Sequence, residues 1–109
     1  MARIKPLPSP LVIGHVDYVV SPMSRHDGAS LEALGVIEWE SERIRIRDEL
    51  SPARTAEILL HEILHACWRN VSLQGDVEEN AVSVLGENLT QVFRDNPHLL
   101  KWLAGTLKK

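Results

Sequence analysis

Two histidines and a glutamate stand close together in an apolar part of the chain, as His61, Glu62 and His65 in the stretch LLHEILHACW. Four residues advance an α-helix by about 400°, so His61 and His65 project from nearly one face, one turn apart. Two imidazole nitrogens so placed can reach one Zn²⁺ ion, each at about 2.0 to 2.1 Å. Glu62 flanks that ion and is placed to take a proton from a water that the ion acidifies. The spacing predicts a zinc hydrolase with its own general base.

This HExxH pattern has a metal-free alternative. A random ordering of a chain with 5 histidines and the same length contains the pattern in roughly two of a hundred cases, before helical context is required. In the alternative, His61 and His65 are core histidines with hydrogen-bond partners, and Glu62 is a surface residue. The rarity of the pattern favours the metal site.

A catalytic zinc site needs a third protein ligand and an open position. Metzincins place a third histidine where this chain has Val71, so that class is excluded. In the next predicted helix Glu78 falls near the centre of the apolar face, whereas Glu79 points away and has capping-box spacing to Asp76. A carboxylate buried among apolar side chains needs a partner, which a metal supplies. We predict Glu78 as third ligand, with Glu79 as the alternative and His98 as a more distant one.

Two other residues near the motif have two interpretations each. Trp68 shares the histidine face, where it either packs in the core or forms a wall of the site. Cys67 is the only cysteine and points well around the helix from His65, which favours a buried thiol over a metal ligand. A single cysteine also excludes an internal disulfide and suits a reducing compartment.

The predicted helices have clear boundary signals. Ser51 and Pro52 supply an N-cap and a first helical residue, and Pro97 ends the middle helix because it disfavours helical geometry at Asn96. The three helices are expected from Pro52 to about 70–75, from Asp76 to about Asp95, and from Pro97 to about Gly105.

The part of the chain before these helices reads as strands. Residues 1–10, with three prolines, are expected to form an extended arm, 11–20 a single buried strand and 22–30 a loop. The alternation of 36–47 predicts a hairpin. With a turn at 41–42 it pairs Trp39 with Ile44, Ile37 with Ile46, Glu40 with Arg43 and Glu38 with Arg45; a wider loop would keep the same pairs. Strands followed by helices indicate an α+β class.

Composition limits the function. The 109 residues suit one domain, and 44% hydrophobic and 25% charged residues predict a folded, soluble chain. A net charge of -3 leaves no broad positive surface, which argues against nucleic acid as a partner. We expect no membrane span and no secretory segment, and therefore a cytoplasmic protein. Nothing in the sequence indicates the oligomeric state.

Three stretches of the chain resemble a known family. LSPARTAEILLHEILHACW, EENAVSVLGENL and RDNP followed by LLKWL are similar to minimal zincins of the gluzincin type, the ImmA/IrrE-like metallopeptidase domain, and especially small HExxH proteins of bacteriophages and prophages. The resemblance covers about 35–107. It implies a zinc peptidase fold with His61 and His65 as zinc ligands, Glu62 as the catalytic glutamate, and Glu78 or Glu79 as the acidic ligand.

The resemblance also implies how a substrate is held. The strand before the motif helix, 43–47, would form one lip of the cleft, and its free edge would pair with an extended peptide. We therefore expect a zinc metalloprotease that acts on an extended peptide or protein segment. The alternative from another class is a non-catalytic, zinc-stabilised module of phage or prophage origin that binds a protein through the same strand edge.

Overall fold

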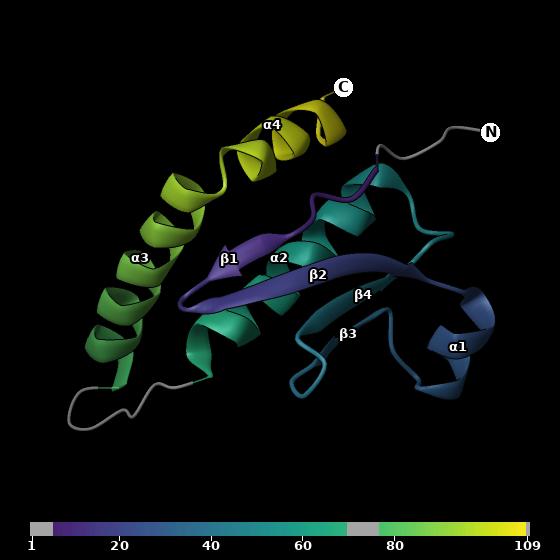
Figure 1. The fold of residues 1–109 in the computed structure, drawn as a ribbon, viewed down its shortest axis with the longest axis horizontal. Helices are drawn as coiled ribbons and strands as arrows, with labels where there is room; N and C mark the ends of the chain where they lie inside the picture. Colours follow the sequence, from purple (N-terminus) through teal and green to yellow (C-terminus); the bar gives the residue numbers. More distant parts are fainter. Residues whose placement is uncertain (1–5, 70–76, 109) are drawn as a thin grey trace.

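The computed structural model describes residues 6–69 and 77–108, apart from the side chains at 77–79 and 82. The fold is α+β, with a sheet followed by three helices, as predicted (Figure 1). The sheet is mixed and has four strands, one more than predicted. The elements are β1 (Leu11–Ile13), β2 (Val16–Met23), α1 (Arg25–Ser30), β3 (Gly35–Glu38), β4 (Arg43–Arg47), α2 (Pro52–Trp68), α3 (Val77–Asp95) and α4 (Pro97–Thr106).

The sheet has the strand order β1-β2-β4-β3. β2 and β4 are parallel, with Val20 opposite Ile44, while β1 with β2 and β3 with β4 are antiparallel. β4 is therefore a central strand, and both of its hydrogen-bonding edges are occupied by neighbours. The predicted free edge at 43–47 is wrong, because a strand paired on both sides cannot accept a peptide. The edge strands of this sheet are β1 and β3.

The single strand predicted for 11–20 is two strands joined by a tight turn. Gly14 has φ 65°, a left-handed conformation that glycine adopts without strain, and Ile13 pairs with Val16 across the turn. The chain reverses there, so β1 and β2 form a hairpin. Gly14 was the available signal for this turn.

The loop predicted for 22–30 is also wrong. β2 continues through Pro22 to Met23, and the short helix α1 begins directly afterwards. The hydroxyl oxygen of Ser24 accepts a hydrogen bond from the Asp27 backbone N–H at 3.0 Å, which caps the first turn of α1. Ser24 before a polar turn is a local cap signal that the loop interpretation overlooked.

The 36–47 hairpin exists with a register two residues away from the predicted one. Ile37 lies opposite Ile44 and Glu38 opposite Arg43, so the connection is wider than a turn at 41–42 and the predicted opposite pairs are wrong. Glu42 takes up φ 55° within this wider loop. A shift of two residues keeps every side chain on its face, and Glu38 still reaches Arg45 diagonally, at 3.7 Å.

The helix boundaries agree with their signals except at the end of α2, which lies at Trp68, before the predicted 70–75. α2 begins at Pro52, and the Ser51 hydroxyl accepts the Arg54 backbone N–H at 3.2 Å. α3 ends at Asp95 as predicted, and α4 begins at Pro97 and ends one residue beyond the predicted end, at Thr106. The predicted cap at Asp76 lies outside the described residues. In the described part of the predicted arm, 6–10 form no helix or strand.

The core lies between the sheet and α2, with α3 and α4 closing one side (Figure 1). Leu59 and Ile63 of α2 are fully buried against the sheet residues Ile44 and Ile46. The buried pair at i and i+4 fixes the rotation of α2, so His61 and His65 face away from the sheet. None of the helices in the described part of the chain has the length and apolar character that a membrane span requires.

Candidate metal site

His61 and His65 lie side by side on the exposed face of α2. Their Nε2 atoms are 3.1 Å apart, and the rings meet edge to face with centroids 4.7 Å apart. Two nitrogens that bind one tetrahedral zinc at about 2.0 to 2.1 Å are about 3.3 Å from each other. The observed separation matches that value within a few tenths of an ångström, so the pair fits a shared ion with little movement. The same separation also allows a hydrogen bond between the two imidazoles.

Glu62 points into the protein rather than into solvent. Its side chain is 6% exposed, and burial raises the pKa of its carboxyl, while the nearby His61 and His65 partly counteract that rise. A side chain at Gly35 would place its Cβ 3.4 Å from Glu62 Oε2 and 2.5 Å from Ile58 Cγ2. The absence of a side chain at Gly35 therefore lets the edge strand β3 lie close to α2 beside Glu62.

The burial pattern contradicts the core-histidine arrangement of the metal-free alternative. That interpretation requires buried histidines and an exposed glutamate, whereas His61 and His65 are exposed and Glu62 is buried. A carboxyl enclosed next to two solvent-facing imidazoles has no evident role in packing.

The third ligand remains a prediction. Glu78 and Glu79 lie in the first turn of α3, and their side chains are outside the described residues. Among the described residues, no three histidine, cysteine, aspartate or glutamate side chains gather as a metal site would require. His98, the more distant candidate, is otherwise engaged: its Nε2 donates a hydrogen bond to the Pro10 carbonyl oxygen at 2.8 Å.

A hollow of about 310 Å³ lies directly beside the histidine pair. Its lining consists of the two histidines together with Leu64 and Trp68 from α2 and Leu85 from α3. Trp68 is 36% exposed, so it forms a wall of this hollow rather than part of the packed core. Sequence reasoning had named Trp68 but missed Leu64 and Leu85. The i, i+3, i+4, i+7 spacing of 61, 64, 65 and 68 was a signal for Leu64.

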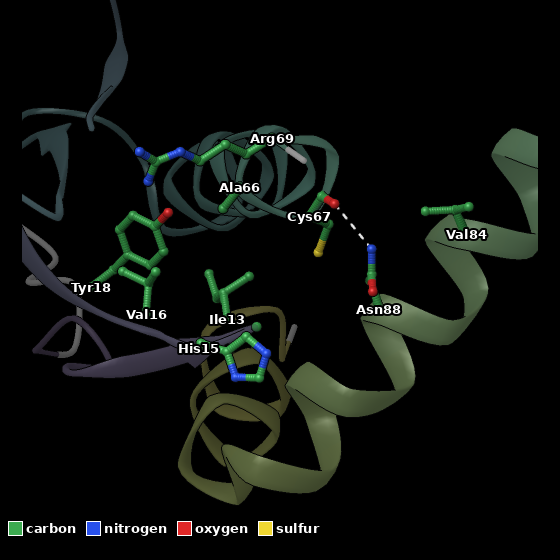
Figure 2. Close-up of a pocket in the computed structure, with 10 residues that line it drawn as sticks. Ile13, His15, Val16, Tyr18, Ala66, Cys67, Arg69, Val84 and Asn88 are labelled. Atoms are coloured by element: carbon green, nitrogen blue, oxygen red, sulfur yellow. Dashed lines mark hydrogen bonds between the residues drawn. The ribbon is translucent and has the colours of Figure 1, made fainter. Parts of the chain in front are cut away.

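A second cavity, of about 450 Å³, lies among the β1–β2 turn, the end of α2 and α3 (Figure 2). Cys67 faces it, together with Ile13 and His15, and its backbone carbonyl accepts a hydrogen bond from Asn88 Nδ2 at 3.0 Å. Burial raises the pKa of the Cys67 thiol. Cys67 is thus the buried thiol that the sequence favoured, and it lines a different cavity from His61 and His65.

Comparisons with models of protein families, with curated proteins and with solved structures found no match. The functional argument therefore rests on the chemistry and geometry of the residues themselves.

Proposed function

We propose that the protein is a zinc-dependent metallohydrolase, and specifically a metalloprotease. The observation that carries this proposal is the pair of exposed imidazoles with Nε2 atoms 3.1 Å apart, adjacent in sequence and space to a buried carboxyl. His61 and His65 would hold the ion, with Glu78 as the third ligand and Glu79 as its alternative. The donor set of two imidazoles and one carboxylate is one that catalytic zinc sites use.

A zinc ion bound there supplies a Lewis acid that polarises a carbonyl group and makes water more acidic. Glu62 is the general base: a carboxylate oxygen takes a proton from the attacking water and later gives it to the departing amine nitrogen. Burial supports this role, because the raised pKa makes the carboxylate a stronger base than an exposed glutamate. His61 and His65 hold and orient the site from one rigid helix.

The substrate would be an extended peptide or protein segment. β3 is an edge strand, and its first residue, Gly35, lies beside Glu62. A peptide that added a strand along the free edge of β3 would pass close to the general base. We therefore propose the free edge of β3 as the substrate-binding edge, instead of β4, where the sequence had predicted it.

Replacement of Glu62 by glutamine tests the proposal. Glu62→Gln keeps the shape of the side chain and removes the base, so zinc content should stay the same while cleavage falls by about 100-fold or more. Cleavage is measured by mass spectrometry on a broad peptide library with the zinc-loaded protein. Glu57→Gln is the matched control, since Glu57 is an exposed glutamate on the same helix, paired with Arg54.

Two outcomes would contradict the proposal. Cleavage by Glu62→Gln at the rate of the unaltered protein would show that Glu62 takes no part in the reaction. If the unaltered zinc-loaded protein cleaves no peptide of the library, the chain is a non-catalytic zinc-stabilised binding module instead.

A further inference from the structure

The hollow beside the histidine pair has apolar walls. Leu64 is 39% exposed and Trp68 36% exposed, and Leu85 faces them from α3. Besides the two imidazoles, the indole N–H of Trp68 is the only polar side-chain group among the described residues that line this hollow. A leucine and a tryptophan left open to water on adjacent turns of one helix indicate a surface that binds an apolar group.

Packing of α2 does not explain these two residues. α2 is already fastened to the sheet through Leu59 and Ile63, both fully buried, on its opposite face. Leu64 and Trp68 instead extend the row of His61 and His65 along the helix, so the apolar walls and the candidate metal ligands form one continuous surface. A group that enters the hollow therefore sits next to the reacting centre.

We propose that this hollow binds a large apolar side chain, preferably an aromatic one, of the residue next to the peptide bond that is cut. Trp68 and Leu85 would then determine specificity. This inference rests on the proposed function, because it takes the histidine pair as the place of reaction. It adds a substrate class, which the histidine motif itself does not define.

The chemistry of the walls supports an apolar occupant. Leu64, Trp68 and Leu85 offer a polar side chain no acceptor and only one indole N–H, so a hydroxyl or charge packed against them would lose part of its water without replacement. An aromatic ring instead gains contact with the Trp68 ring system. The volume, about 310 Å³, lies at the lower end of the range of roughly 300 to 1,000 Å³ found for small-molecule sites, which suits one side chain better than a whole ligand.

Hydroxamates that bind zinc and carry different side chains test this inference. Affinities of N-acetylphenylalanine hydroxamate and N-acetylglycine hydroxamate for the zinc-loaded protein are measured by calorimetry. We expect the phenylalanine compound to bind tighter by about tenfold or more. Trp68→Ala and Leu85→Ala should each reduce this ratio to about threefold or less. Leu100→Ala, which removes an exposed leucine on α4, is the matched control and should leave the ratio unchanged.

The zinc content of every variant is measured in parallel, so that loss of the metal is not mistaken for loss of the hollow. Equal affinities of the two hydroxamates, or a ratio unaffected by Trp68→Ala, would overturn the inference and leave the proposed zinc site standing. A protein that takes up no zinc would overturn both. A dimer that Trp68→Ala converts to a monomer would also overturn the inference, because a second copy would then cover the hollow.

Discussion

Glu62 is both buried and ionisable, a combination that selection for stability alone would not favour. It is nine-tenths buried, and burial raises the pKa of its carboxyl, because the enclosed position disfavours the ionised form. The neighbouring histidines offset only part of this cost. Such local destabilisation is common where a residue serves chemistry rather than folding.

The burial of the Glu62 carboxyl predicts how the free energy of unfolding changes when Glu62 is replaced. A carboxyl with a raised pKa in the folded state stabilises the fold below its ordinary pKa, 4.5, and loses that contribution as the pH rises through the folded pKa. At pH 7 the metal-free Glu62→Gln protein should therefore have a higher free energy of unfolding than the unaltered protein. The difference should shrink at pH 4, where both side chains are neutral.

Urea denaturation in the presence of a chelator, at pH 7 and pH 4, measures this effect. Glu57→Gln is again the control and should change stability little at either pH, because its carboxyl is exposed. A metal-free Glu62→Gln protein less stable than the unaltered one at pH 7 would show that the carboxylate is well stabilised by its surroundings.

The junction of α3 and α4 is fastened to the sheet by one side chain. Asn96 is fully buried: its Oδ1 accepts the Val12 N–H at 2.8 Å, and its Nδ2 donates to the carbonyl oxygens of Val12 and Val92 at 2.8 and 2.7 Å. Asn96 makes no side-chain cap for α4. Its hydrogen bonds instead hold the edge strand β1 against the end of α3.

Asn96→Ala should therefore be strongly destabilising. The substitution leaves the backbone polar groups of Val12 and Val92 without their partner, with an expected loss of about 2 to 4 kcal/mol in the free energy of unfolding. Asn88→Ala, which removes one hydrogen bond to the Cys67 carbonyl, is the comparison and should cost about 1 kcal/mol. Urea denaturation of both variants checks this, and equal losses would contradict the account of Asn96 as a multiple anchor.

Elements defined by local signals were predictable, and those defined by distant partners were not. Ser51 and Pro52 identify the start of α2, and Pro97 the start of α4, from residues within one turn. The central place of β4 depends on its parallel pairing with β2, which the alternation of 43–47 does not encode. The register of the β3–β4 hairpin likewise depends on how wide a loop the rest of the sheet allows.

The same distinction applies to the candidate site, where some features follow from local sequence and others depend on distant elements. Helical spacing alone brings His61 and His65 together, and the 3.1 Å between their Nε2 atoms follows from it. The burial of Glu62 depends on β3 lying against α2 at Gly35, and the hollow depends on Leu85 of α3. Both are contacts between elements far apart in sequence, so periodicity gave no indication of them.

On the scale of the whole molecule, α2 lies between two surfaces that a substrate could use. The edge strand β3 lies on the side of Glu62, and Leu85 of α3 lines the hollow beside the histidines. The proposed site is therefore complete only when α3 is docked on α2. Zinc held by both helices should link metal binding to this docking and stabilise the fold by mass action.

Replacement of the predicted third ligand tests whether zinc binding is linked to the docking of α3 on α2. We expect Glu78→Ala to weaken zinc retention far more than Glu79→Ala, because Glu78 is predicted on the inward face of α3. Competition with a chromogenic chelator measures the zinc affinity of both variants. Loss of a residue that binds zinc directly should weaken this affinity by about tenfold or more. Equal losses, or a larger loss for Glu79→Ala, would reverse the assignment and leave the histidine pair as proposed.

The central claim is that one zinc ion is shared by His61, His65 and a carboxylate of α3. A crystal structure of the zinc-loaded protein, with anomalous scattering recorded at the zinc edge, tests it most directly. The account predicts a single anomalous peak about 2.0 to 2.1 Å from the Nε2 atoms of both histidines and from a carboxylate oxygen of Glu78 or Glu79, with one position left for water. Imidazoles hydrogen-bonded to each other in the presence of ample zinc, with no peak between them, would contradict it.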